Sequence, residues 1–197
     1  MRCFFSATAL AVLTLIFSSC ATAPPKPTGP GGFTGGSGGS DLVIRNSGFH
    51  FPERIGPFAR GQNQQYDAAG LDLSVKYVAG ALIVADIYEY PTGGKSLATE
   101  FANRKDEIAL YHSDARLLSE GEVTIHPGGR AHHGRRARFA ISKGYQYSFP
   151  PPYQSDLLVF QRGDRFVEYR FSYSAAHRER AESEIDKFID ALAWPEG

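Results

Sequence analysis

Cysteine is nearly absent from this chain of 197 residues, and both examples stand near its start, at Cys3 and Cys20. No cysteine follows in residues 21–197, so this long segment can form neither an internal disulfide nor a thiolate zinc site. A catalytic cysteine and a redox-active cysteine pair are excluded there for the same reason. Any chemistry in the main part of the chain has to use other side chains.

Net charge is also absent, because 21 Lys and Arg residues balance 21 Asp and Glu residues. Nucleic-acid-binding proteins need a basic surface to neutralise phosphates, so this balance argues against DNA or RNA as a partner. The chain lacks the phosphate-loop, dinucleotide-binding and zinc-protease motifs. Its acidic residues show no spaced pair that would indicate a glycosidase. We therefore predict a protein that is not an enzyme and uses no cofactor.

A hydrophobic run long enough to span a membrane is missing as well. The apolar stretch over residues 3–17 is shorter than the roughly 20 residues that a membrane-spanning helix needs. Arg2 precedes this stretch, and the small residues Ser18 and Ser19 lead from it to Cys20. A basic start, a short apolar core and small residues before a cleavage point are typical of an export signal, which we place at residues 1–19.

The end of this signal, Phe17-Ser18-Ser19-Cys20, resembles the lipobox of bacterial lipoproteins. The resemblance implies that Cys20 is acylated, becomes the first residue of the mature protein and anchors it in the lipid bilayer. In such lipoproteins an Asp after the cysteine is associated with retention in the inner membrane, so Ala21 favours the outer membrane, with the protein facing the periplasm. Secretion and inner-membrane anchoring are the alternatives.

A segment rich in Gly, Pro and Ser follows Cys20. Such a segment cannot bury enough apolar surface to offset the entropy lost on ordering, so it is expected to be disordered. We predict that residues 20–45 form the lipidated cysteine and a flexible linker, and that residues 46–197 form one domain.

Hydrophobic periodicity assigns the elements of this domain. Apolar-polar alternation or short apolar runs predict strands at 41–45, 58–66, 71–78, 81–90, 120–126, 138–142, 156–161 and 165–173. The 81–90 strand is apolar throughout its first half, which favours a central position.

Helical spacing predicts one helix over 96–111 and a second from about residue 175, with Ser174 as its cap. The first is expected to bury Leu97, Phe101, Ile108 and Tyr111, and to turn Glu100, Arg104 and Lys105 outward. The order of elements indicates an α+β fold, an antiparallel sheet with two helices packed on one face.

An antiparallel strand pair, a helix, further strands and a terminal amphipathic helix ending in Trp194-Pro195 resemble the PsbP-like fold. The resemblance rests on the order of elements after residue 45. It implies a binding or assembly role without catalysis.

The densest polar cluster of the domain contains His126, Arg130, His132, His133, Arg135, Arg136 and Arg138. Adjacent residues of a strand point to opposite faces, so His132 and His133 cannot bind one ion together. A two-residue loop would place His126 diagonal to His133, and a three-residue loop would place it diagonal to His132. Either register supplies two ligands where a catalytic zinc takes three, and the arginines would repel a cation. The cluster suits an anion or an acidic partner better, and a solvated strand pair is the alternative.

A second candidate surface is the aromatic segment 144–154, which contains Tyr145, Tyr147 and Tyr153 among prolines. A stiff, extended aromatic surface could dock a partner or stack a sugar, or it could simply pack over a sheet edge. We therefore predict a lipoprotein that docks to an envelope protein complex. The arginines and tyrosines would carry this docking, and a module for a small ligand, anion or metal is the alternative function.

Overall fold

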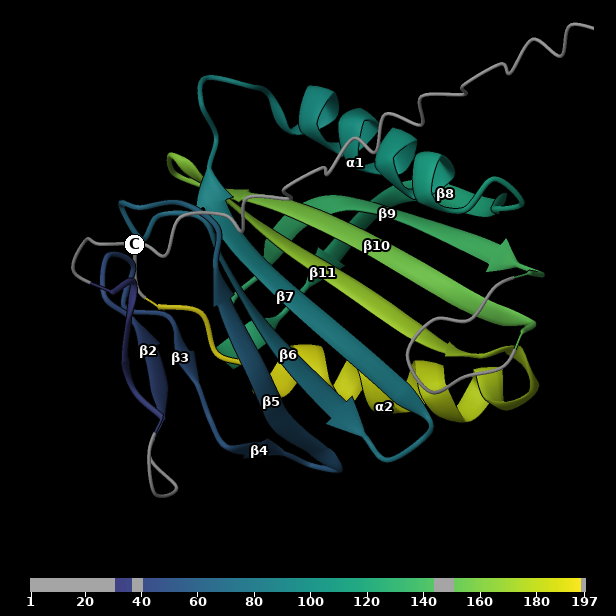
Figure 1. Ribbon diagram of the computed structural model, residues 1–197, viewed down its shortest axis with the longest axis horizontal. Coiled ribbons are helices and arrows are strands. Elements are labelled where there is room, and N and C mark those ends of the chain that lie inside the picture. The colour runs from purple at the N-terminus through teal and green to yellow at the C-terminus, as the bar shows by residue number, and fades with distance from the viewer. Residues whose placement is uncertain (1–30, 37–40, 144–150, 196–197) are drawn as a thin grey trace, which may run out of the picture.

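The computed structural model describes residues 31–36, 41–143 and 151–195. Its centre is an eight-stranded sheet, antiparallel throughout, in the order β4-β5-β6-β7-β11-β10-β9-β8 (Figure 1). The strands are β4 (Arg54–Ile55), β5 (Phe58–Gln65), β6 (Leu73–Ala79), β7 (Ile83–Pro91), β8 (Arg116–Ile125), β9 (His132–Ile141), β10 (Tyr153–Arg162) and β11 (Arg165–Ser174).

The middle strands bury both of their faces. In β10, Leu157 and Val159 belong to one apolar cluster, whereas Leu158 and Phe160 belong to the other. This is why such strands appear in the sequence as continuous apolar runs. The central position predicted for 81–90 is confirmed, since β7 lies between β6 and β11.

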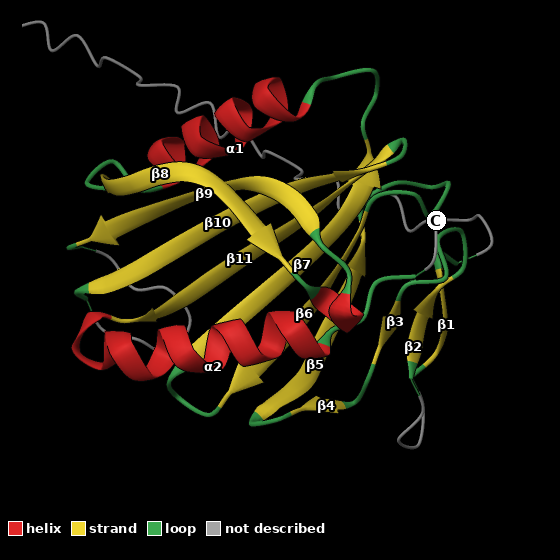
Figure 2. Cartoon of the chain, turned by 180° about the vertical axis from the view of Figure 1, so that it is seen from behind, coloured by secondary structure: helices red, strands yellow, loops and turns green. Residues whose placement is uncertain are grey.

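Two helices cover the sheet, α1 (Leu97–Tyr111) and α2 (Arg178–Ala191), the latter preceded by the 3₁₀ turn η2 (Ala175–His177). The predicted α+β class, with an antiparallel sheet and two helices, is confirmed. The prediction that both helices pack on one face is wrong. Phe101 of α1 packs with Leu157 and Val159, whereas Phe188 of α2 packs with Leu158 and Phe160, so the helices lie on opposite faces (Figures 1 and 2).

Neither of these helices is long and apolar enough to cross a membrane, among the residues that the structure describes.

Details of the helices also differ from the periodic pattern. The Ser96 side chain caps α1 by accepting a hydrogen bond from the Thr99 amide at 3.2 Å. The predicted inner face is wrong at two positions, because Glu100 is fully buried whereas Tyr111 is 71% exposed. Ser174 makes no side-chain capping bond, since η2 separates it from the start of α2.

A small three-stranded sheet precedes the main one, formed by β1 (Phe33–Gly35), β2 (Leu42–Ile44) and β3 (His50–Phe51). Leu42 and Ile44 are buried and join the apolar cluster beneath α2. The predicted linker boundary at residue 45 is therefore wrong, because strands within 20–45 belong to the folded part. Composition predicts disorder for this Gly-rich segment, but it does not show that Leu42 and Ile44 can pack into the core of the domain.

The two edges of the main sheet differ strongly. On one side, β4 has 2 residues, whereas β8 on the other side has 10. In the described part of the chain, β8 pairs with β9 alone and leaves its outer edge open. Long open edges can pair with further strands, so most proteins shorten or cover them.

Candidate functional site

The arginines of β9 divide between the two faces of the sheet. Arg136 and Arg138 lie on the face covered by α2 and both contact Asp156 of β10, a carboxylate with no exposed surface. The distance from Arg138 Nε to Asp156 Oδ1 is 2.9 Å, and Arg138 Nη1 also lies 2.6 Å from Glu182 Oε1 of α2. The Tyr173 hydroxyl donates a further bond to Asp156 at 3.2 Å. The structure thus brings two predicted arginines together within an internal charge network.

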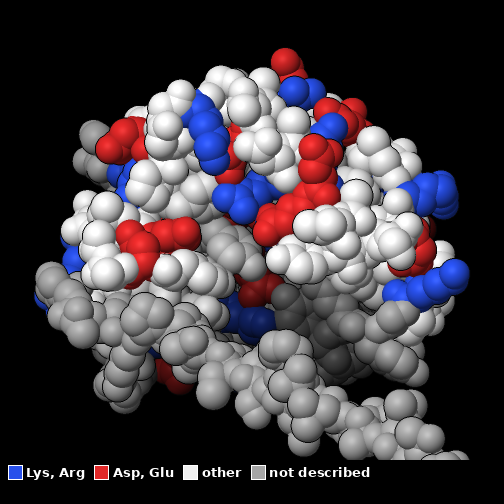
Figure 3. All heavy atoms as spheres, turned by 45° about the horizontal axis from the view of Figure 1, so that its top comes forward, with Lys and Arg blue, Asp and Glu red and all other residues white. Residues whose placement is uncertain are grey.

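Arg135 lies on the opposite face, beside α1. Its Nη2 atom is 3.1 Å from Glu120 Oε1 of β8, and its guanidinium carbon is 4.9 Å from the centre of the Phe101 ring. Arg130 is exposed and ends the 3₁₀ turn η1 (Pro127–Gly129). Basic and acidic residues also lie side by side on the face that carries α1, around a hollow (Figure 3). Nearby carboxylates therefore compensate Arg135, Arg136 and Arg138, and the role of the four predicted arginines in binding an anion or partner stays a prediction.

The three histidines do not converge. Pairing of Thr124 with His133 follows the register expected for the shorter loop, but His126 lies outside both strands, at the start of η1. His133 Nδ1 is 2.9 Å from the hydroxyl of Thr124. The His132 ring lies on the other face, with its centre 4.2 Å from that of Trp194. In the described residues, no group of three His, Cys, Asp or Glu side chains could hold a metal ion.

His132 should make the stability of the protein depend on pH. Burial lowers its pKa, the charges of Arg162 and Arg130 lower it further, and its Nε2 atom is buried without a hydrogen-bond partner. The unfolded chain binds this proton near its ordinary pKa of about 6.5. The free energy of unfolding should therefore be highest above about pH 6.5 and fall as the pH drops through the lowered pKa of the folded state.

Urea unfolding at about pH 7.5 and about pH 5 would measure this loss. We expect His132→Phe, which keeps an aromatic ring against Trp194, to reduce the difference between the two pH values. His133→Phe, on the exposed side of the same strand, is the matched control. An unchanged difference in His132→Phe would contradict the prediction.

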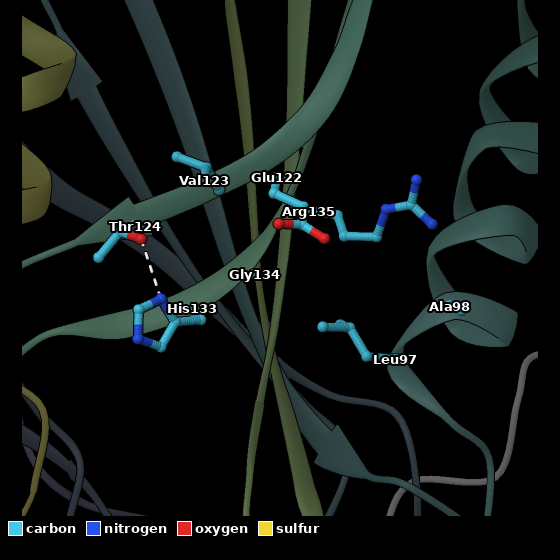
Figure 4. Close-up of a pocket in the computed structure, with 8 residues that line it drawn as sticks. All are labelled: Leu97, Ala98, Glu122, Val123, Thr124, His133, Gly134 and Arg135. Carbon is cyan, nitrogen blue, oxygen red and sulfur yellow. Dashed lines mark hydrogen bonds between the residues drawn. The ribbon is translucent and has the colours of Figure 1, made fainter.

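A depression of about 560 Å³ lies between the first turn of α1 and the strands β8 and β9. Figure 4 shows the Arg135 side chain extended toward α1, while His133 and Thr124 are joined by their hydrogen bond. Glu122 and Arg135 stand directly opposite each other on the two strands. The Glu122 carboxylate is exposed and has no ion-pair partner among the residues described, so it is available to a basic group from outside.

The predicted tyrosines are only partly covered by the structure. Tyr145 and Tyr147 lie outside the described residues. Tyr153 begins β10 and is buried, with its hydroxyl 3.3 Å from His112 Nδ1. Burial raises the pKa of Tyr153 to about 12. Tyr153 is therefore part of the packing of the sheet, and its buried side chain is not accessible to a partner.

Sequence reasoning missed a group of exposed apolar residues around the connection from α1 to β8. Of the five large hydrophobic residues exposed in the described chain, four fall within residues 110–118: Leu110, Tyr111, Leu117 and Leu118. Leu117 and Leu118 are adjacent at the start of β8, and neighbouring exposed apolar groups are typical of interaction surfaces. The adjacent apolar residues Leu117 and Leu118 could have indicated this surface in the sequence. The predicted strand began at residue 120, however, and left this pair unassigned.

No family model and no curated protein matches this chain. Several solved structures align with it, among them the following two. A crystal structure of a Pseudomonas aeruginosa protein of unknown function has 8% identity and a TM-score of 0.43, over 80% of this chain and 97% of that one. The solution structure of cyanobacterial PsbP from Synechocystis has 11% identity and a TM-score of 0.46, over 88% of this chain and 99% of that one. PsbP is also the family that the order of elements resembles, and the likeness concerns that order alone.

Proposed function

We propose that this protein is a non-catalytic docking module of the bacterial envelope. Acylated Cys20 would hold it to the outer membrane on the periplasmic side, and β8 with Leu117 and Leu118 would bind an envelope protein. The observation that carries the docking role is the pair of exposed leucines, Leu117 and Leu118, on the open edge strand β8.

The chemistry of this surface favours an extended segment of the partner. A strand added to β8 would satisfy its open edge through main-chain hydrogen bonds, and side-chain contacts would give specificity. Leu117 and Leu118, which are 45% and 37% exposed, offer apolar contacts at one end of the strand. Glu122 offers a carboxylate beside the depression at the other end. The expected partner strand therefore carries apolar residues and one basic residue.

The docking surface can be tested with Leu117→Asp/Leu118→Asp. Two charges placed at an apolar contact should lower recovery of the crosslinked partner from native membranes by more than about tenfold, as for interface hot spots. Tyr66→Ala is the matched control, because Tyr66 is the remaining large exposed hydrophobic residue, at 48%, and lies far from β8 in the strand order. Equal recovery with both variants, or crosslinking to a second copy of this chain alone, would overturn the proposal.

Membrane attachment can be tested separately by replacing Cys20. Without its thiol, the chain has no acylation point at the predicted cleavage site, so Cys20→Ala should move from the membrane fraction to the soluble fraction. Cys3→Ala is the control. It alters the only cysteine inside the predicted signal, so this variant should remain in the membrane fraction. Mass spectrometry of the mature N-terminus checks for the acyl groups. Membrane-bound Cys20→Ala would contradict lipid anchoring.

A further inference from the structure

A second concave site lies on the α1 face, away from β8. Helix α1 packs on β9 and β10, and the polar half of this face, formed by β6, β7 and β11, stays open beside the helix. Residues of β7, β11 and α1, together with Tyr66 and Asp72 from the connection between β5 and β6, line a cleft of about 340 Å³. This size is within the range of small-ligand sites in proteins.

Buried charges form the floor of the cleft. Glu168, which is 1% exposed, accepts a bond from the Tyr90 hydroxyl at 2.7 Å and lies 3.3 Å from Arg104 Nε. Arg170 contacts the same carboxylate and also Glu107, which is 3.2 Å from Arg104 Nη1. Each guanidinium is thus compensated by carboxylates within the protein. The network fixes the floor but leaves no unpaired positive charge for an anionic ligand.

Tyrosine rings form the walls. The guanidinium carbon of Arg104 lies 4.7 Å from the Tyr90 ring centre, and that of Arg170 lies 5.4 Å from the Tyr88 ring centre. Tyr66 stacks on Tyr88 at 6.3 Å and keeps 48% of its surface exposed. A ligand can therefore reach the ring of Tyr66 at the rim, whereas the rings of Tyr88 and Tyr90 already carry arginines.

Asp72 supplies a hydrogen-bond acceptor to the same cleft. Its side chain is half-buried and has no hydrogen-bond or ion-pair partner in the described part of the chain. The Asp67 carboxylate holds this turn by accepting bonds from the backbone amides of Leu71 at 2.8 Å and Asp72 at 3.0 Å. Burial raises the pKa of Asp72, and Asp67 raises it further. A ligand that donates a hydrogen bond to this half-buried carboxylate would therefore be stabilised in the cleft.

These features select one class of ligand. The compensated arginines disfavour an anion, and no group of three His, Cys, Asp or Glu side chains in the described residues could hold a metal ion. The polar walls disfavour a purely apolar molecule. A sugar combines hydroxyls that donate and accept with an apolar ring face that can stack on an aromatic side chain. We propose that the cleft binds a neutral carbohydrate, with its ring against Tyr66 and a hydroxyl donating to Asp72.

The full-length chain, purified in detergent, can be tested with maltotriose and chitotriose, which differ in their acetamido groups. Saturation-transfer NMR should show contact with at least one of them, and titration calorimetry should give its affinity. Tyr66→Ala and Asp72→Asn should each weaken that affinity by about tenfold or more, since each removes a stacking or charge-assisted contact. Leu117→Asp/Leu118→Asp is the control, because these residues lie on the β8 edge.

Binding lost in both cleft variants but kept in the β8 variant would support the site, provided that circular dichroism shows all variants folded. No transfer to either sugar would overturn the proposal, as would equal affinity in all variants. Displacement of the sugar by low concentrations of sulfate would identify an anion site and overturn it too. Partner crosslinking through β8 is a separate readout, so failure of the sugar site leaves the proposed docking function standing.

Discussion

Replacing Asp156 with Ala should destabilise the protein by about 3–5 kcal/mol, because removing one partner of a buried ion pair leaves the other charge uncompensated. Asp156 has no exposed surface and is contacted by both Arg136 and Arg138. Burial opposes the charge of Arg138, but the hydrogen bond to Asp156 and its negative charge raise the Arg138 pKa above its ordinary value. Arginine side chains keep their charge in proteins, so the variant removes the acceptor that Arg136 and Arg138 share and leaves Arg138 with Glu182.

Urea unfolding of Asp156→Ala beside the parent chain measures this loss. Glu184→Ala is the matched control, because Glu184 pairs at 3.0 Å with Lys187, whose side chain is 66% exposed. Exposed pairs contribute at most about 1 kcal/mol, so this control should unfold near the parent midpoint. Adding Arg136→Met and Arg138→Met to the Asp156→Ala chain should recover much of the stability, since no buried charge then lacks a partner. A loss below about 1 kcal/mol in Asp156→Ala would contradict the argument.

The sequence identified the arginines as candidate binding residues but did not indicate that Asp156 is their partner. Arg138 and Asp156 stand directly opposite each other, yet their pairing depends on the register of β9 and β10 across the segment that joins them. Periodicity carries no information about that register. The strand predicted at 138–142 also began too late, because the charged residues of β9 resemble a surface loop when their partners are unknown. The sequence therefore showed a dense polar region, but the ion pairs of Arg136 and Arg138 with Asp156 could not be predicted from it.

Helix placement was limited in a similar way. Alternation predicted the strands, and the apolar first half of 81–90 correctly predicted the central position of β7. Which face each helix covers depends on the path of the connections, and that path leaves no periodic signal in the sequence. The cleft beside α1 also escaped prediction, since Tyr66, Tyr88 and Arg170 come from segments that only the sheet order brings together.

Replacing Gly134 with Val should destabilise the protein by about 3 kcal/mol or more through overpacking. Gly134 is buried in β9 opposite Phe160 of β10. A Cβ atom built on Gly134 would lie 2.3 Å from Phe160 Cδ1 and 2.5 Å from the Val159 carbonyl oxygen. The Phe160 ring cannot move away freely, because it packs against Tyr169 and Trp194. The carbonyl is part of the strand backbone and cannot move without disturbing the sheet.

Gly121→Val separates this effect from the general cost of changing a glycine in a strand. Gly121 lies in the neighbouring strand β8, and no heavy atom stands within 4 Å of its Cβ position. We expect its free energy of unfolding to change by less than about 0.5 kcal/mol. Adding Phe160→Ala to Gly134→Val should recover little stability, because the clash with the Val159 oxygen remains and a cavity opens beside Trp194. Nearly complete recovery in that double variant would show that the ring alone requires the glycine. Little recovery would show that close approach of the two backbones requires it, which is the result that we expect.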